Sequence, residues 1–434
     1  MKGAIEKLDD AGFVAYVVGG SVRDFLLGRE TKDHDIATDA TPDQVMKVFP
    51  DSITVGKAFG VIKVPVKDVA PIEIATFRED LEYHDHRHPK GVKFSGPIED
   101  AKRRDFTVNA LFYDPKSSRI LDPTGGMEDL HARRVRAIGD PEERFKEDAL
   151  RLVRAVRFTT TLGFELEAAT AAAVKAKARL ITKVSLERVR DELGLMWTGP
   201  RPADALKLLS HLGLLQYILP EVEGLKGVDQ SPIHHPEGDV WSHTLNLLQQ
   251  LARQTPKRSF TLGWAALLHD IGKPLASRRS GGKNFNGHEV EGARIAMAVA
   301  DRFKMSRGEA LRISAMIENH LKFKDVFQMR ESTLQRFIRE PFFDELLTLH
   351  KADASASDGN LAFHEFCEFK LKELQLLLHQ ETPRLLDGTD LIQLGLQPGP
   401  EFSGILRVIE DLTLEKRLRS KEEALEYVVK HFVK

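Results

Sequence analysis

The alternation of apolar and polar residues changes partway along the chain. In its first third, short apolar runs such as 16–18 and 72–77 have the length and β-branched content of strands. Two segments between these runs are predicted as helices: one follows Gly19-Gly20, and the other begins at Thr41, a good N-cap that precedes a proline. From about Glu142 the strand pattern gives way to helical periodicity. The sequence therefore predicts an α+β fold, in which a head with a mixed sheet and helices precedes an all-helical remainder.

Composition narrows the class of protein. Of 434 residues, 42% are hydrophobic and 29% are charged, which is typical of a globular protein. The 63 Lys and Arg residues are balanced by 65 Asp and Glu residues, so any surface that binds nucleic acid must be local. A single cysteine, Cys367, excludes a disulfide framework and a cysteine-rich zinc module. No stretch reads as a signal peptide or a membrane span, and we expect a cytoplasmic enzyme or regulator.

Two short segments near the N-terminus carry residues suited to phosphate and metal binding. Gly19-Gly20 lies between a predicted strand and a helix, where glycine lets the backbone approach a phosphate and the helix start offers N–H groups. Asp33 and Asp35 alternate along the next predicted strand, so their carboxylates share a face. Such a pair of oxygen ligands suits Mg²⁺. Taken alone, these residues are also explained by a tight turn and a solvated strand end.

The combination of these segments is more specific. Residues 16–36, YVVGGSVRDFLLGRETKDHDI, resemble the nucleotidyltransferase superfamily and, within it, the family of class II tRNA nucleotidyltransferases (CCA-adding enzymes) and bacterial poly(A) polymerases. Later segments are similar to further motifs of that family, in its order: RRDFTVNA at 103–110, DPTGG at 122–126, EDALR at 147–151 and LER at 186–188. The resemblance implies transfer of a nucleoside monophosphate to an RNA 3′ end, with pyrophosphate as the leaving group.

The resemblance also implies roles for individual residues. Asp33 and Asp35 would be the catalytic carboxylates and would hold Mg²⁺, since two such ions activate the attacking hydroxyl and neutralise phosphate charge. Glu73 is a further candidate for a third carboxylate, and Arg104 would reach the triphosphate or the base. The implied nucleotide-binding residues are Gly20, Arg23, Arg104, Asp148, Arg151 and Arg154.

Asp148 and Arg151 are suited to reading a base. Cytosine and adenine present an amine donor beside a ring-nitrogen acceptor, whereas uracil and guanine present the reverse. Because a carboxylate only accepts and a guanidinium only donates, a fixed Asp–Arg pair matches cytosine and adenine and leaves unmatched polar groups with the other two. We expect both residues on one helix, with Arg154 and Arg157 on the same face and apolar residues opposite. Without the resemblance, a surface ion pair explains the spacing.

A second constellation of ligand types lies between about residues 230 and 360. It combines histidines and aspartates, and an adjacent His-Asp pair ends the apolar segment WAALLHD. The pattern resembles the HD phosphohydrolase domain, which implies one or two divalent ions, a transition metal or Mg²⁺, and activity on a phosphate ester. The alternative is an HD domain that is retained only as an inactive helical scaffold. In an active domain, Lys273 would contact a substrate phosphate. The implied metal ligands are His243, His269, Asp270, His288, His320 and Asp353.

Local features bear on RNA binding. Residues 86–104 hold six Lys or Arg and two acidic residues, a patch that suffices for phosphate contacts. The segment 76–94 resembles a loop that is shortened in family members that add only C, so its length favours addition of A as well. The Pro-Gly-Pro-Glu turn at 398–401 resembles the family's C-terminal segment, and it either contacts a tRNA arm or closes the last helical pair.

Together these features predict four parts: a nucleotidyltransferase head (1–135), a neck with the base-reading helix (136–200), a helical body with the HD domain (201–365) and a helical tail that contacts tRNA (366–434). We expect template-independent addition of CCA to tRNA from CTP and ATP, with tRNA bound through its acceptor and T arms and with no membrane partner. Three alternatives stay open. They are an A-only tRNA adenylyltransferase or poly(A) polymerase that uses the same site, an HD phosphohydrolase whose head only binds RNA, and a non-enzymatic RNA-binding protein.

Overall fold

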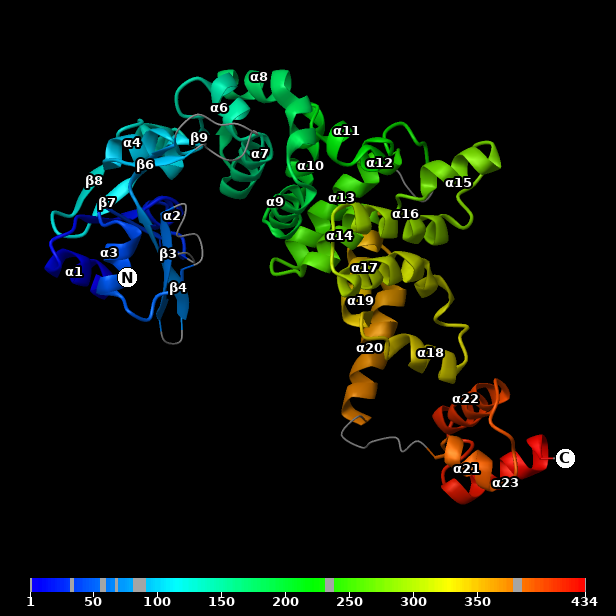
Figure 1. Cartoon of the computed structure of the whole chain (residues 1–434). Helices are drawn as coiled ribbons and strands as arrows, with labels where there is room; N and C mark the ends of the chain where they lie inside the picture. The colour runs from blue at the N-terminus through cyan, green and yellow to red at the C-terminus, as the bar shows by residue number, and fades with distance from the viewer. Residues whose placement is uncertain are drawn as a thin grey trace. The chain divides into compact units, whose positions relative to one another are not determined.

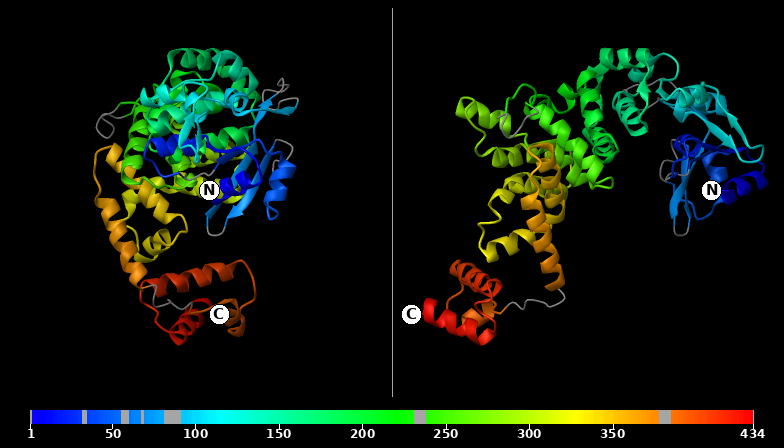
Figure 2. Two further views of the ribbon diagram at one scale, coloured as in Figure 1. Left: turned by 90° about the vertical axis from the view of Figure 1, so that its left-hand side faces the viewer. Right: turned by 180° about the vertical axis from the view of Figure 1, so that it is seen from behind.

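The computed structural model describes residues 2–31, 35–54, 60–66, 69–80, 91–230, 238–377 and 385–433. The chain folds into two compact units, Met1–Glu223 and Gly224–Lys434 (Figure 1). Within the described ranges, the strands belong to the first unit and the second unit is built from helices, as the rear view in Figure 2 also shows. No helix in this described part of the chain is long and apolar enough to cross a bilayer.

The head is built on a six-stranded sheet in the order β3-β4-β2-β1-β7-β8. Strand β2 runs parallel to β4, and the other neighbouring pairs are antiparallel. The parallel pairing sets Asp35 beside Glu73, so these two residues share a face of the sheet. The strands are β1 (Ala15–Val18), β2 (Asp35–Thr38), β3 (Val61–Val66), β4 (Val69–Thr76), β7 (Phe112–Asp114) and β8 (Arg119–Leu121), and a separate hairpin pairs β5 (Arg78–Asp80) with β6 (Val92–Phe94).

Apolar residues of the sheet are buried on both faces. Ile36 and Ile74 pack with residues of the helices α1 and α3 on one face. Ala37 packs with Ala101 and Ala110 on the other. Neighbouring residues of β2 therefore enter different cores, as the two-residue period of a strand requires. The helices of the head are α1 (Lys2–Asp10), α2 (Gly20–Leu26), α3 (Pro42–Val48), α4 (Pro97–Lys102), the 3₁₀ turn η2 (Thr107–Asn109) and α5 (Gly126–His131).

The sequence-based prediction of the head is confirmed. Strands β1, β2 and β4 lie where short apolar runs indicated them, and α2 begins at Gly20, the second residue of the diglycine. Helix α3 begins behind Thr41, whose backbone N–H donates to Gln44 Oε1 at 2.8 Å in a capping box. The predicted fold class, a mixed sheet with helices followed by a helical remainder, is the one observed.

The remainder of the first unit is mainly helical, and α7 packs along α9. The prediction that strands end before about Glu142 was wrong, because β10 pairs in parallel with β9 through Glu165 and Arg134. A two-residue strand is too short to leave a periodic pattern in a sequence. The elements are β9 (Arg134–Val135), α6 (Pro141–Glu147), α7 (Leu150–Leu162), β10 (Glu165–Leu166), α8 (Ala168–Lys177), the 3₁₀ turn η3 (Ala178–Lys183), α9 (Leu186–Thr198), α10 (Pro202–His211), α11 (Leu215–Ile218) and α12 (Pro220–Glu223).

In the second unit α16 packs along α17 and α13 along α19, while α21 to α23 share an apolar cluster of their own. Its helices are α13 (Val240–Gln254), α14 (Phe260–Leu268), α15 (Lys273–Ser280), α16 (His288–Arg302), α17 (Arg307–Asn319), the 3₁₀ turn η4 (His320–Asp325), α18 (Glu331–Ile338), α19 (Phe343–Ala356), α20 (Ala362–Leu377), α21 (Gly388–Gln393), α22 (Glu401–Leu414) and α23 (Lys421–Phe432). The four-part division expected from the sequence is finer than the two units and stays a prediction.

Candidate functional site

A cavity of about 500 Å³ opens in the first unit, between the head and the helices α7 and α9. It brings together the diglycine turn, the first residue of β2 and several arginines. Asp35 and all six implied nucleotide-binding residues contribute to it, the candidate Glu73 does not line it, and Asp33 lies outside the described residues. The cavity is lined by Gly19, Gly20, Arg23, Asp35, Arg103, Arg104, Asp105, Asn109, Asp148, Leu150, Arg151, Arg154, Arg157, Phe158 and Arg188.

The diglycine turn brings backbone close to charged side chains. Gly19 has a φ of 70°, and a Cβ there would lie 3.1 Å from Arg104 Nη1 and 3.9 Å from Asp35 Oδ2. Glycine is therefore favoured by both the conformation and the space. One turn into α2, the guanidinium of Arg23 donates to Asn109 Oδ1 at 2.5 Å and to Asp24 Oδ1 at 2.9 Å. These contacts hold Arg23 at the wall of the cavity.

Two carboxylates and an ammonium lie in register on three neighbouring strands of the sheet. Asp35, the first residue of β2, lines the cavity, and Glu73 is its partner in register. Lys63 Nζ lies 2.6 Å from Glu73 Oε1, and this hydrogen bond raises the pKa of Lys63. Glu73, the candidate third carboxylate, is thus already engaged by a cation.

The two arginines of the RRDFT segment are anchored by a buried carboxylate. Asp100 Oδ1 lies 2.6 Å from Arg103 Nη2, and Asp100 Oδ2 lies 3.0 Å from Arg104 Nη2. Burial alone would raise the pKa of Asp100, but the two guanidiniums, Arg104 foremost, outweigh burial and lower it. Arg104 also lies over the ring of Phe112, 5.1 Å from the centroid. Arg104 therefore faces the cavity in a fixed orientation.

A second buried network joins the head to α7 and α9. Asp105 Oδ2 accepts from Arg154 Nε at 2.8 Å, and Arg154 Nη1 donates to Glu192 Oε1 at 3.1 Å. Burial opposes ionisation of Asp105, yet the charge of Arg154 and the amide of Asn109 lower its pKa to about 2. Glu192 also accepts from Arg157. Arg154, implied by the sequence to bind nucleotide, therefore lines the cavity between two carboxylates.

The expectation that Asp148 and Arg151 lie on one continuous helix was wrong. Helix α6 ends at Glu147, Asp148 is extended with φ −137° and ψ 103°, and α7 begins at Leu150. The side chain of Asp148 accepts from the N–H of Leu150 at 3.1 Å, a local bond that competes with helix. Both residues still line the same cavity, and the expected division of α7 into a buried apolar face and an arginine face is confirmed.

Asp148 and Arg151 each pair with a different residue. Arg188 Nη2 donates to Asp148 Oδ2 at 2.8 Å. Arg151 Nη1 donates to Glu147 Oε2 at 2.6 Å, and its Nη2 donates to the carbonyl of Arg103 at 2.9 Å. Sequence reasoning gave no role to Arg188. Its signal was the segment LER at 186–188, which resembled a family motif without indicating a partner.

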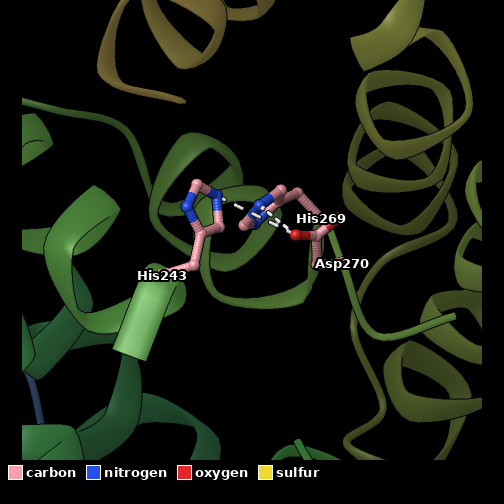
Figure 3. A group of neighbouring side chains, drawn as sticks. All are labelled: His243, His269 and Asp270. Atoms are coloured by element: carbon pink, nitrogen blue, oxygen red, sulfur yellow. Dashed lines mark ion pairs between the residues drawn. The ribbon is translucent and has the colours of Figure 1, made fainter. Parts of the chain in front are cut away.

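The metal-ligand types implied by the sequence converge in the second unit. His243 on α13 faces His269 and Asp270 at the end of α14, as Figure 3 shows. His243 Nε2 lies 3.9 Å from Asp270 Oδ2 and 3.0 Å from Asp353 Oδ1, and His269 Nε2 lies 3.1 Å from Asp270 Oδ2. The ligand atoms of His243, His269 and Asp270 all lie within 4.8 Å of one another.

A second trio shares the same aspartate. His288 Nε2 lies 3.2 Å and His320 Nε2 lies 3.9 Å from Asp270 Oδ1. The ligand atoms of this trio also lie within 4.8 Å of one another. Asp270 therefore offers one oxygen to each trio, an arrangement that suits one divalent ion or a bridged pair.

Hydrogen bonds aim the imidazoles at this centre. The Nδ1 atoms of His269, His288 and His320 lie 2.9, 2.9 and 2.6 Å from the carbonyl oxygens three residues earlier. A carbonyl only accepts, so each Nδ1 donates and each Nε2 keeps its lone pair, as in metal-ligating histidines. Among the described residues, His269 Nε2 and His288 Nε2 are buried without a well-aligned hydrogen bond, and both face the carboxylate oxygens of Asp270. The residues therefore fit a cation.

Protonation states agree with that fit. Burial lowers the pKa of His320 to about 4, which leaves a neutral imidazole at pH 7. Burial opposes ionisation of Asp270, but His269 and Lys273 outweigh it and lower its pKa. Lys273 is buried, and its Nζ lies 2.7 Å from Asp270 Oδ2 and 2.6 Å from Gln230 Oε1. Its ammonium therefore pairs with Asp270, and a contact between Lys273 and a substrate phosphate stays a prediction.

Family models match three segments of the chain. The model described as "Poly A polymerase head domain" matches residues 15–136, and "Probable RNA and SrmB- binding site of polymerase A" matches residues 163–225. The model "HD domain" matches residues 240–357 and so includes all the clustered histidines.

Curated relatives extend the match to nearly the whole chain. The CCA-adding enzyme of Lactobacillus helveticus is 33% identical over 431 residues, which cover 97% of this chain and 94% of the relative. The chain belongs to the CCA-adding enzyme family. The CCA-adding enzyme of Geobacillus thermodenitrificans is 46% identical over 217 residues, and this match spans only about half of each chain, 50% of this one and 53% of the relative. Family membership thus rests on the full-length match, and the local match is stronger but shorter.

Solved structures of this family have the same fold. The crystal structure of the Bacillus stearothermophilus CCA-adding enzyme in complex with CTP is 28% identical, covers 99% of this chain and 95% of that one, and has a TM-score of 0.72. The Thermotoga maritima CCA-adding enzyme complexed with tRNA is 20% identical with a TM-score of 0.59, and it bears on the fold alone. This chain therefore has the fold of the CCA-adding enzymes.

Proposed function

We propose that the protein adds CCA to the 3′ end of tRNA, with CTP and ATP as nucleotide donors and pyrophosphate as the leaving group. The observation that carries the proposal is the single cavity that joins the diglycine turn, Asp35 and the Asp148/Arg151 pair. Family membership supports it, because the relatives that match the whole chain are CCA-adding enzymes. tRNA as the substrate makes the cytoplasm the expected location.

The chain's own residues supply most of what the reaction needs. The backbone of Gly20 and the guanidiniums of Arg23 and Arg104 line one side of the cavity, where they would bind and orient a triphosphate. Asp35, with Asp33 as its partner from the sequence, would hold divalent cations, for which we propose Mg²⁺. Bound Mg²⁺ neutralises phosphate charge and favours deprotonation of the attacking hydroxyl. Glu73 lies beside Asp35 in register and remains a candidate for a third ligand.

Base choice would follow from hydrogen-bond polarity. Asp148 offers an acceptor to the exocyclic amine of cytosine or adenine, and Arg151 offers donors to the neighbouring ring nitrogen. Uracil and guanine would leave a carbonyl against the carboxylate and an N–H against the guanidinium. Such mismatches can change the ratio of kcat/KM between two nucleotides by large factors, because the mismatched polar groups lose water without gaining a hydrogen-bond partner.

Incubation of the protein with tRNA that lacks CCA, followed by sequencing of the products, tests the proposal. We expect CCA ends from CTP and ATP in the wild type and no extension by Asp35→Asn. A matched control is Asp51→Asn, an exposed carboxylate of the head. Addition of A alone, or of long A tails, would favour the alternative adenylyltransferase or poly(A) polymerase. Extension by Asp35→Asn at the wild-type rate would refute the site.

A second function is supported by the histidine cluster of the second unit. We propose that this cluster binds a divalent ion, a transition metal or Mg²⁺, and hydrolyses a phosphate ester. Bis(p-nitrophenyl) phosphate with Mn²⁺, Ni²⁺ or Mg²⁺ is a direct probe. We expect turnover by the wild type, loss with Asp270→Asn, and no change with Asp325→Asn, an exposed carboxylate of the same unit. An inactive wild type that still binds the ion would favour a scaffold role.

A further inference from the structure

Asp148 is held by an arginine that has no proposed contact with the base. Arg188, on α9, donates from Nη2 to Asp148 Oδ2 at 2.8 Å and from Nη1 to Oδ1 at 3.3 Å. The N–H of Leu150 donates to Oδ1 at 3.1 Å. An ionised carboxylate has about four acceptor sites. Three donors therefore leave one acceptor site of Asp148, which lines the cavity, for a fourth hydrogen bond.

The printed contacts of Asp148 and Arg151 engage the two side chains with different partners. Asp148 is extended and lies between α6 and α7, and its carbonyl accepts from the N–H of Arg151 at 3.0 Å. The guanidinium of Arg151 donates to Glu147 Oε2 at 2.6 Å and to the carbonyl of Arg103 at 2.9 Å. The carboxylate of Asp148 is held by Arg188, whose planar guanidinium matches it with two bonds. Loss of Arg188 would leave the N–H of Leu150, which bonds one of the two carboxylate oxygens, to orient Asp148.

We propose that Arg188 is a specificity-determining positioning residue of the nucleotide site. It fixes Asp148 so that one acceptor site faces the incoming base. The inference rests on the proposed nucleotide addition and deepens it, because it assigns part of the discrimination against uracil and guanine to a residue 40 positions from the aspartate that it holds. Arg188 needs no contact with the nucleotide for this effect.

Two substitutions in the full-length chain test the proposal. Arg188→Gln removes both the charge and the paired N–H donors of the guanidinium, and Arg188→Lys keeps the charge without those paired donors. The matched control is Arg190→Gln on the same helix, since Arg190 pairs with its exposed neighbour Asp191 at 2.8 Å. The readout is kcat/KM for single additions, with CTP against UTP on tRNA that lacks CCA and ATP against GTP on tRNA that ends in CC.

We expect Arg188→Gln to lower the CTP-over-UTP ratio by about 10- to 100-fold, the range for a lost hydrogen bond to a charged group. Arg188→Lys should restore the ratio only in part, and Arg190→Gln should keep the wild-type ratio. The change should appear mainly as a higher KM for CTP and a lower KM for UTP, because a merely destabilised protein would lose kcat for every nucleotide alike.

The outcomes separate this inference from the function on which it rests. A wild type that adds no nucleotide refutes the proposed function itself. An active Arg188→Gln whose CTP-over-UTP ratio stays within twofold of the wild type refutes only the role of Arg188. If Arg188→Gln fails to fold, as judged by circular dichroism, the ratio in Arg188→Lys decides: a reduced ratio supports the role and an unchanged ratio overturns it.

Discussion

Substitution of Asp105 by asparagine should loosen the junction between the head and α7. The change keeps the shape and removes the charge that faces Arg154 at 2.8 Å. The pKa of Asp105 falls from 3.8 to about 2, so the fold favours the ionised form by about 2.4 kcal/mol at 1.36 kcal/mol per unit. Breaking a buried ion pair typically costs about 3–5 kcal/mol. Glu192 still compensates Arg154, and we therefore expect a loss of about 2–3 kcal/mol.

Hydrogen exchange followed by mass spectrometry measures this loss in the full-length chain. Amides of α7 and α9 should exchange about 30- to 150-fold faster in Asp105→Asn than in the wild type, as the loss in free energy requires. Peptides from α14, in the other compact unit, should not change and serve as an internal control. The matched control substitution is Asp191→Asn at an exposed ion pair.

The pH dependence supplies a second check. Because the folded pKa of Asp105 is depressed, its stabilising contribution is complete above the unfolded value of 3.8 and is lost as the pH falls through about 2. The difference between wild type and Asp105→Asn should therefore be full at pH 7 and shrink between pH 3.8 and 2. Equal exchange of α7 amides in both proteins at pH 7 would show that the network does not stabilise the junction.

Three further substitutions or reagents probe other parts of the chain. Gly126→Ala should destabilise the first unit by about 2 kcal/mol or more, since a Cβ there would overlap the carbonyl oxygen of Thr107, whereas Gly308→Ala, with open space around it, should cost nothing in the same denaturant titration. Cys367 is buried and burial raises its pKa to about 12, so the native protein should react with iodoacetamide at pH 8 about a thousandfold more slowly than the unfolded chain; equal rates would contradict the burial. His320→Gln should weaken binding of Mn²⁺ or Ni²⁺ by about 10- to 100-fold in equilibrium dialysis and leave CTP addition intact, while His431→Gln, exposed on α23, should change neither.

The parts of the fold that the sequence predicted are those with local causes. The strands and capped helices of the head follow from apolar runs, a diglycine and the Thr41 cap, all of which act within a few residues. The break between α6 and α7 lies at Asp148, whose carboxylate accepts both from the nearby N–H of Leu150 and from Arg188, 40 positions away. The apolar period of the segment 141–157 continues through this break, so the helix was expected to continue.

The candidate sites divide in the same way. Residue types and spacing indicated the histidine cluster and most of the nucleotide site, because chemistry limits which side chains serve as ligands. The partners that orient those ligands were missed. Glu192 on α9 and Asn109 after the RRDFT segment contact Arg154 and Arg23 only because the tertiary fold brings them there.

The carbonyl contacts of the imidazoles have a thermodynamic consequence. His269 follows the last residue of α14 and His320 follows the last residue of α17, and each donates to a carbonyl of its own final turn. The same bond therefore terminates a helix and points a ring. The two rings therefore lose their rotational entropy when the chain folds, before any ion binds. Removal of the ion by a chelator should consequently leave the second unit folded, whereas small domains that fold only with their metal unfold when it is removed.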